Sequence, residues 1–338
     1  MIINSVKLSN FRNHSSYFLQ CTDNTSLILG KNGSGKTSVL EAIYILTQGK
    51  SFRATDHDII KRGADFYRAE IAYNNGESST VTYDGSVKTF IVMNKKTRRL
   101  PAKNKYPVIL FQPSDLNLID HAPSRRRTYF DRIFSQFDSS YASALYRYDK
   151  AIRQRNELLK SDAISPDSVF SWNIMLSKYG ADLYSMRQQF IQEINLFITD
   201  TYRSIASNKD NVKILYQTSV SSPDESKYLK ILEANFEKDH YLGHTSFGIH
   251  HDDYVFNFNN AHADGSASRG ESRSLILALK FIEANLIYTK SGKRPIILLD
   301  DVFSELDPVR RKCLVRNFQD NQVIITSVED IANIQNDQ

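Results

Sequence analysis

The stretch TSLILGKNGSGKTSVLEAIYIL, residues 25–46, decides the fold that this sequence predicts. A short apolar run at 25–29 indicates a strand, and residues 37–46 indicate a helix. Between them, GKNGSGKT at residues 30–37 follows the pattern G-x-x-x-x-G-K-T. Glycines in such a loop let backbone N–H groups turn inward around phosphate oxygens, and the helix dipole adds to the attraction. The stretch therefore predicts a nucleotide-binding α/β protein.

The residues of this loop have separate expected roles. We expect Lys36 to neutralise the β- and γ-phosphates as a catalytic cation, and Thr37 to ligate Mg²⁺. The predicted nucleotide-binding residues of this segment are Gly30, Lys31, Asn32, Gly33, Ser34, Gly35, Lys36, Thr37 and Ser38.

A second element of the site is IILLDD, residues 296–301. Four apolar residues indicate a strand that is buried on both faces, as in a parallel sheet, and ligands bind at the C-terminal end of such strands. We expect Asp300 to contact Mg²⁺ through a water ligand, and Asp301 to orient or deprotonate the attacking water. The alternative is that both acids cap a following helix. Asp is one methylene shorter than Glu, so we expect Asp301 to hold the attacking water less closely than a Glu would. We therefore expect slow hydrolysis.

The segment ASRGESRSLILALK, residues 267–280, indicates the start of a long helix. Its apolar stripe continues with 4, 3, 4 spacing through Leu275, Leu279, Ile282 and Leu286. A glycine-bearing turn at a helix N-terminus has unpaired N–H groups and favours an anion. The alternative is that Ser268 and Gly270 only cap the helix.

Composition describes an ordinary globular protein. The 338 residues are 41% hydrophobic and 24% charged, and no apolar run approaches the roughly 18 residues of a membrane span. The start of the chain lacks the features of a signal peptide. We therefore expect a cytoplasmic protein without a membrane partner. Cys21 and Cys313 are isolated, which argues against a disulfide framework or a cysteine metal site.

Positive charge is concentrated in one segment. Residues 88–160 contain sixteen Lys and Arg against six Asp and Glu, an excess of ten, whereas the whole chain carries only +5. This excess favours a polyanionic partner. The alternative is a solvated basic face without a partner.

The chain divides into three predicted segments. Residues 1–115 alternate strand-like runs with turns, and Asn75-Gly76 indicates a hairpin. Residues 116–240 change to helical spacing and form a predicted lobe, in which Gly180 interrupts any coiled-coil rhythm. Residues 241–338 return to alternating strands and helices. We expect an α/β ATPase domain, formed by the first and last segments, that is split by a mainly helical lobe without a long coiled coil.

The order of these elements resembles the ATP-binding-cassette superfamily. In that superfamily a Ser-Gly-Gly-Gln-like signature precedes the acidic strand, and a Ser-x-Leu-Asp turn follows it, as SELD at residues 304–307 does here. The resemblance implies that ATP is the nucleotide and that the signature of one subunit closes over the ATP of the other. It therefore implies an ATP-dependent homodimer, with Ser268, Gly270, Glu271 and Asp307 at the shared nucleotide.

Nearly the whole chain is similar to the RecF family, in the branch with the SMC and Rad50 ATPases. The similar blocks are LSNFRNHSSY, GKNGSGKTSVLEAIYIL, GKSFR, PSRRRTYFDR, HHDDY, SRGESRSLILALK and LLDDVFSELD. SMC and Rad50 proteins carry hundreds of coiled-coil residues in place of the short lobe here, which favours RecF. The resemblance implies DNA binding near single- and double-strand junctions, help to RecR and RecO in loading RecA, and ATP hydrolysis that releases the protein.

Basic residues in two places are the predicted DNA contacts. Because Lys and Arg give affinity for phosphates without reading sequence, we expect steep salt dependence and little sequence preference. One or two arginines of the second group have the alternative of pairing with Asp131 or the other subunit. The candidates are Lys95, Lys96, Arg98, Arg99, Arg125, Arg126 and Arg127.

Further roles follow from the resemblance alone. Arg12 and Asn13 are candidate nucleotide contacts, with a salt link that fixes the first strand as the alternative. Gln112 stands where cassette ATPases place a Mg²⁺-sensing Gln. Cassette transporters have a switch His after the last strand, whereas Thr326 and Ser327 stand here, and a hydroxyl does not take up a proton as His does.

Three other functions are weighed against this interpretation. A transporter's nucleotide-binding subunit is disfavoured by the missing switch His and the basic lobe. A nucleotide-gated scaffold that binds only proteins would differ in showing no ATP-dependent DNA binding. A P-loop kinase would leave the Ser268 turn without a role.

Overall fold

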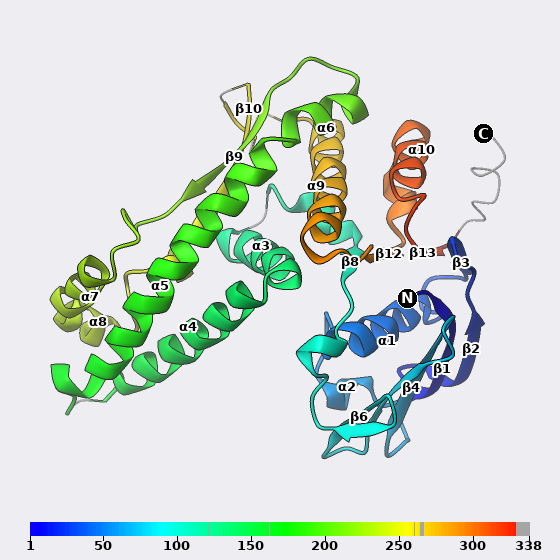
Figure 1. The fold of residues 1–338 in the computed structure, drawn as a ribbon, viewed down its shortest axis with the longest axis horizontal. Coiled ribbons are helices and arrows are strands. Elements are labelled where there is room, and N and C mark those ends of the chain that lie inside the picture. The colour runs from blue at the N-terminus through cyan, green and yellow to red at the C-terminus, as the bar shows by residue number, and fades with distance from the viewer. Residues whose placement is uncertain (121, 162, 260, 264–266, 329–338) are drawn as a thin grey trace. The chain divides into compact units, whose positions relative to one another are not determined.

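The computed structural model describes residues 1–120, 122–161, 163–259, 261–263 and 267–328 (Figure 1). The chain divides into two compact units. The first unit consists of Met1–Leu116 and Glu283–Gln338, and the second unit consists of Asn117–Ile282. Residues 241–282, which the sequence analysis groups with the ATPase domain, therefore pack with the helical residues. The reason is strand pairing, because β10 (Asp253–Phe258) pairs with β9 (Val212–Gln217) in the lobe.

Two sheets build the described part of the first unit. One is antiparallel, with the order β2-β1-β4-β5-β6-β7, and the other is parallel, with the order β3-β13-β12-β8. The strands are β1 (Ile3–Phe11), β2 (His14–Gln20), β3 (Thr25–Leu29), β4 (Tyr67–Tyr73), β5 (Ser78–Tyr83), β6 (Lys88–Val92), β7 (Lys95–Thr97), β8 (Val108–Phe111), β12 (Ile296–Asp300) and β13 (Val323–Ser327).

Helix α1 (Lys36–Gln48) forms the centre of this unit. Residues 38–47 are all buried, because the helix contacts β1, β4 and β5 of one sheet and β8, β12 and β13 of the other. Such a helix is apolar around its circumference, and the sequence VLEAIYIL meets this demand except at Glu41. Its flanking elements are α2 (Asp56–Ile59), the 3-10 turns η1 (Ala102–Asn104), η2 (Pro113–Asn117) and η4 (Val302–Glu305), and α10 (Pro308–Asn317).

The predicted hairpin at Asn75-Gly76 is confirmed. It joins β4 to β5, with Gly76 at φ +81° and its N–H donating to the Tyr73 carbonyl at 3.1 Å. The positive φ is the conformation for which glycine is suited.

The second unit is mainly helical. Its longest helices, α4 (Ser139–Leu158) and α5 (Pro166–Asn195), pack side by side (Figure 1). The other elements are α3 (Pro123–Phe137), α6 (Ile198–Ala206), α7 (Glu225–Ala234), α8 (Phe236–Leu242), η3 (Ile249–His251), β11 (Ala261–His262) and the start of α9 (Arg269–Ser291). Gly180 does not end α5. A Cβ there would lie 2.6 Å from the Tyr228 ring of α7, so the glycine allows close approach of the two helices.

A buried arginine fixes the HHDDY block, residues 250–254, in this unit. Arg187 of α5 donates to Asp252 at 2.8 Å and to Asp131 at 2.9 Å, and only 2% of its side chain is exposed. His251 donates from Nε2 to the Thr245 carbonyl at 3.1 Å. The neighbouring His250 has its pKa lowered to about 4 by burial, so it is neutral at neutral pH. The described contacts give this block a structural role.

No helix among the described residues has both the length and the apolar character required to cross a bilayer.

Gln322, at the start of β13, ties that strand to the antiparallel sheet. Its buried amide accepts from the Ile3 N–H at 2.8 Å and donates to the Ile3 carbonyl at 2.7 Å. Gln322→Ala leaves both backbone groups unpaired, so we expect the free energy of unfolding of this unit to fall by about 2 kcal/mol. Urea unfolding measures this change. The control Gln319→Ala, at an exposed position, stays within about 0.5 kcal/mol of wild type, and equal midpoints for the two variants would contradict the assignment.

Candidate nucleotide-binding site

The predicted phosphate loop joins β3 to α1 as expected. Gly33 and Gly35 have φ of +80° and +96°, which side chains rarely adopt, and the Gly30 N–H donates to the Ser327 carbonyl of β13 at 3.2 Å. The loop residues Lys31, Asn32, Gly33 and Ser34 are exposed, whereas Lys36 and Ser38 at the helix start are buried. The loop is therefore open on its outer side and fixed at its base.

The turn between β1 and β2 supports this loop from the side. Asn13 donates from Nδ2 to the Gly33 carbonyl at 2.9 Å, and His14 donates from Nε2 to the Gly35 carbonyl at 3.1 Å. A Cβ on Gly35 would lie 2.3 Å from His14 Nε2 and 2.4 Å from Asn13 Oδ1. Gly35 is therefore required by close approach as well as by its φ.

Lys36 lies folded over the loop. Its ammonium donates to the carbonyls of Gly30 at 2.7 Å and Lys31 at 3.2 Å, and it lies 3.6 Å from Asp301 Oδ2. The side chain is only 4% exposed. Its charge is thus placed at the centre of the loop, where a phosphate would lie.

The three predicted Mg²⁺ residues lie together at the carboxyl ends of the parallel strands. Thr37 Oγ1 donates to Asp300 Oδ1 at 2.7 Å, and Gln112 Nε2 donates to Asp300 Oδ2 at 3.3 Å. A hydroxyl, a carboxylate and an amide oxygen are hard ligands of the kind that Mg²⁺ prefers, with waters completing its shell. The residues present therefore fit this ion.

Asp301 has a strained backbone, with φ +52°. Its N–H donates to the Thr326 hydroxyl at 2.9 Å and to the Thr326 carbonyl at 3.2 Å. The carboxylate makes no capping hydrogen bond to the following η4 turn, and its Oδ1 is buried with no partner among the described residues. Such an orphaned acceptor suits a bound water better than a capping role.

Thr326, one of the two hydroxyl residues at the end of β13, contacts both acids. Besides accepting from Asp301, its hydroxyl donates to Asp300 Oδ1 at 3.1 Å, and the residue is fully buried. No role for this position follows from the sequence. The contacts make Thr326 a positioning residue for the acidic pair.

A pocket of about 600 Å³ opens beside the loop. Its described lining includes five Lys or Arg and two Asp, a formal excess of three positive charges. This charge and volume suit a nucleoside triphosphate, which is strongly anionic. The charged lining residues are Arg12, Lys36, Arg53, Lys61, Arg62, Asp58 and Asp301.

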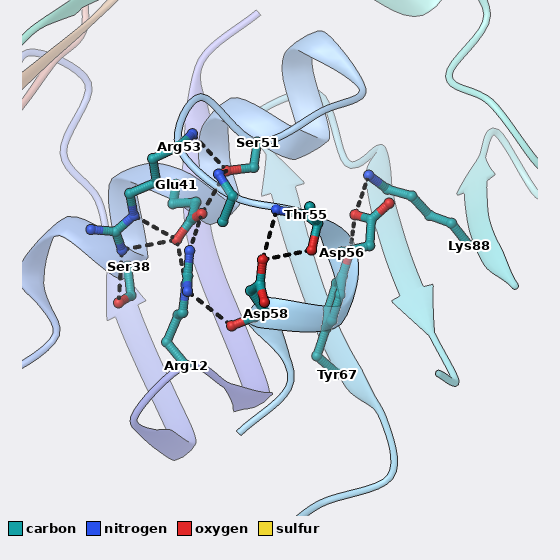
Figure 2. A network of polar contacts seen from close by, with 11 residues as sticks. Arg12, Ser38, Glu41, Ser51, Arg53, Thr55, Asp56, Asp58, Tyr67 and Lys88 are labelled. Atoms are coloured by element: carbon teal, nitrogen blue, oxygen red, sulfur yellow. Dashed lines mark hydrogen bonds and ion pairs between the residues drawn. The ribbon is translucent and has the colours of Figure 1, made fainter. Parts of the chain in front are cut away.

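Glu41 of α1 joins two of these arginines, Arg12 and Arg53 (Figure 2). The carboxylate is completely buried and accepts two hydrogen bonds from Arg12, at 2.8 and 2.9 Å, and two from Arg53, at 2.9 and 3.0 Å. Ser51 donates a fifth at 2.6 Å. Burial acts to raise the pKa of Glu41, but these donors outweigh it and the pKa is lowered.

For Arg12 the structure shows a salt link, and its predicted contact with nucleotide stays a prediction. It makes the salt link that was the alternative for this residue, and it also lines the pocket. Arg53, His14 and Glu41 were not singled out from the sequence. The available signal for Glu41 was a single acid within an otherwise apolar helix, and a buried charge requires a partner.

The signature residues form a capping box at the start of α9. Ser268 N–H donates to Glu271 Oε2 at 2.6 Å, and Glu271 N–H donates to Ser268 Oγ at 3.2 Å. Ser268 is exposed, and its hydroxyl keeps a proton to donate. Asp307 is the N-cap of α10 and accepts from the Arg310 N–H at 3.0 Å. The capping alternative is thus realised, and the predicted contact with a second chain stays a prediction.

The predicted DNA contacts fall into two groups in different units. Lys95 and Lys96 lie on β7, followed by Arg98 and Arg99, and all four are exposed. In the second unit Arg125 is exposed, but Arg126 pairs with Asp253 through two bonds of 2.7 Å.

Arg127 donates to the Asp252 carbonyl at 2.6 Å. Arg126 and Arg127 are thus occupied at the start of β10, not with Asp131 as the alternative had it. These bonds give the two residues a structural role, and their contact with DNA stays a prediction.

Comparisons with known proteins agree with this geometry. Residues 2–337 match the family described as RecF/RecN/SMC N terminal domain. The chain is 34% identical to the DNA replication and repair protein RecF of Clostridium beijerinckii, with 98% of this chain and 93% of the relative covered. It is 32% identical to the protein of the same name from Clostridioides difficile, with 97% and 92% covered.

Solved structures show the same fold. The recombination mediator protein RecF-ATPrS in the RecFOR pathway matches with a TM-score of 0.87 at 26% identity, covering 97% of this chain and 93% of that chain. An SmcHead bound to the C-winged helix domain of ScpA matches with a TM-score of 0.55 at 14% identity, covering 98% and 90%. The predicted cassette-type α/β fold is confirmed.

The two loop glycines give a matched test of the site. Gly33→Ala and Gly35→Ala share the cost of a positive φ, but the Cβ at Gly33 meets nothing within 4 Å. We expect Gly35→Ala to weaken binding of a fluorescent ATP analogue at least about tenfold more than Gly33→Ala. Equal affinities would show that the Asn13 and His14 contacts do not shape the loop.

Acidification tests the Glu41 network. Because folding lowers the Glu41 pKa, its stabilisation is present above the unfolded value of about 4.3 and is lost as pH falls through the folded value. We expect Glu41→Gln to lower the free energy of unfolding by about 2 kcal/mol at neutral pH, and by less below about pH 4. Denaturant unfolding across pH measures this. The control Glu70→Gln, in a surface pair with Arg68, changes little at either pH.

Proposed function

This chain belongs to the RecF family of the RecF/RecN/SMC group, and from that premise we propose that it is an ATP-dependent DNA-binding protein of recombinational repair and replication. The observation that carries the proposal is the convergence of Lys36, Thr37, Asp300, Asp301 and Gln112 at one end of the parallel sheet, beside a basic pocket. The relatives are named DNA replication and repair proteins, and the solved neighbours are described as bound to ATP or an analogue.

ATP is the nucleotide that we propose for the pocket. The loop backbone and Lys36 bind its phosphates, while Arg12 and Arg53 line the same pocket. Thr37, Asp300 and Gln112 hold Mg²⁺, which when bound neutralises phosphate charge. Asp301 orients the attacking water through its partly exposed carboxylate. We propose slow hydrolysis, below about 10 s⁻¹, that acts as a switch.

We propose that ATP joins two copies of the chain. The hydroxyl of Ser268, in the exposed turn, then donates a hydrogen bond to the γ-phosphate of the second copy's ATP. Gly270 and Glu271 shape that turn. Asp307 adds a contact at the same nucleotide. Hydrolysis removes the shared phosphate and releases the pair, which explains how nucleotide state controls assembly.

The proposed ligand of the dimer is DNA near single- and double-strand junctions, in cooperation with RecR and RecO in loading RecA. Support comes from the names of the relatives and from the exposed basic residues Lys95, Lys96, Arg98, Arg99 and Arg125. These residues carry no acidic partner among the described residues, so they are available to phosphates.

Sedimentation with ATP tests the shared nucleotide. We expect wild type to dimerise, and Ser268→Arg to weaken dimerisation at least about hundredfold because a bulky cation blocks the turn. Ser268→Asp keeps a helix cap but repels phosphate, so it also stays monomeric. The control Ser226→Arg, at another exposed serine, dimerises normally.

Two results would contradict this proposal. One is a wild-type chain that stays monomeric at saturating ATP with gapped DNA. The other is a Ser268→Asp variant that dimerises like wild type. Gel shifts on gapped DNA with and without ATP then separate DNA binding from a scaffold that binds only proteins.

A further inference from the structure

The β6–β7 hairpin ends in an unusual turn. Val92 pairs with Lys95 and Ile91 with Lys96, so Met93 and Asn94 form a two-residue loop. Their φ angles are +50° and +60°, the pattern of a type I′ turn, which matches the twist of the strands. Asn tolerates this conformation, but Met does not belong to the residues that favour it.

Met93 is costly in two ways at this position. Its backbone is in the left-handed region, and this apolar residue is 59% exposed to solvent. Neither property stabilises the hairpin. Asn or Gly would adopt the positive φ with less strain, and a polar side chain would avoid exposing apolar surface to water. Strain of this kind concentrates at functional sites.

Cations stand on both faces of the hairpin behind this tip. Side chains alternate along a strand, so Lys95 shares the face of Val92 and Lys96 shares the opposite face with Ile91. Both lysines are exposed, and neither has an ion-pair partner in the described part of the chain. Lysines also protect an edge strand such as β7 from pairing with other chains. That role accounts for the lysines but not for Met93.

A groove of duplex DNA fits all three observations. The major groove is about 12 Å wide and admits a two-stranded ribbon. A ribbon with a cation on each face reaches the phosphates of both strands, and an apolar tip contacts or partly unstacks bases. Arg98 and Arg99 continue the positive charge beyond the ribbon.

We propose that the β6–β7 hairpin enters a groove of duplex DNA, with Met93 against the bases and Lys95 and Lys96 against opposite phosphate backbones. The proposal rests on the DNA binding proposed above and names the element and the residue that wedge into the duplex. Met93 contributes contact with bases, whereas the lysines contribute the salt-dependent part of the affinity.

Fluorescence anisotropy with the full chain, ATP and a gapped duplex tests this assignment. We expect Met93→Asn to weaken binding about tenfold with an unchanged salt slope, while its thermal midpoint rises by about 2 °C because the strain is relieved. Met93→Leu keeps the apolar tip and binds like wild type. Lys95→Gln with Lys96→Gln makes the negative slope of log K against log salt shallower by about 1.8.

A 2-aminopurine base in the duplex reports unstacking directly. Its fluorescence rises with wild type and Met93→Leu, and stays low with Met93→Asn. As a matched control, Val87→Asn changes an exposed apolar residue in the neighbouring β5–β6 hairpin and leaves binding unchanged.

Three outcomes are distinguishable. If Met93→Asn binds as tightly as wild type, the wedge is wrong even though DNA binding stands. If Met93→Leu is as weak as Met93→Asn, contact through the apolar side chain is wrong. If wild type binds no DNA with or without ATP, the proposed function itself fails.

Discussion

The rest of the first unit depends on the burial of α1 between two sheets. The helix contacts strands of the antiparallel sheet on one side and of the parallel sheet on the other. Its N-terminus is therefore held at the carboxyl ends of β12 and β8, where Asp300 accepts hydrogen bonds from both Thr37 and Gln112. Because protein interiors are closely packed, the helix cannot shift without disturbing both sheets. The position of the phosphate loop follows from this constraint.

Glu41 shows how the same helix serves the pocket. A buried carboxylate is unfavourable unless it is paired, and the pairs here are two arginines that come from separate loops. The carboxylate thus connects the core of α1 to the pocket wall. Thr326 positions Asp300 and Asp301 in a similar way, by hydrogen bonds to its neutral hydroxyl. Glu41 and Thr326 thus position charged side chains, although neither of them lines the pocket itself.

The sequence predicted the parts of the fold that depend on local patterns. Short apolar strands such as β3, the helix α1 and the turn at Gly76 were recognisable because their residues favour those structures. Strand β7, with the sequence KKT, was missed because its pairing with β6 is determined by tertiary contacts rather than by propensity.

For the candidate site, the phosphate loop and the acidic pair could be identified from spacing alone. Glu41, His14 and Arg53 could not, because their roles arise from contacts between segments distant in the chain. The same reason explains why the lobe extends past residue 240, since the pairing of β9 with β10 is a long-range contact.

The support that Asn13 and His14 give to the phosphate loop has a consequence for assembly. These side chains fix the carbonyls of Gly33 and Gly35 by hydrogen bonds within the protein, so the fold itself contributes to the shape of the loop. A preorganised receptor loses little conformational freedom on binding. More of the free energy of the contacts between nucleotide and loop then remains to favour a second chain that closes over the exposed end of the nucleotide, as proposed above.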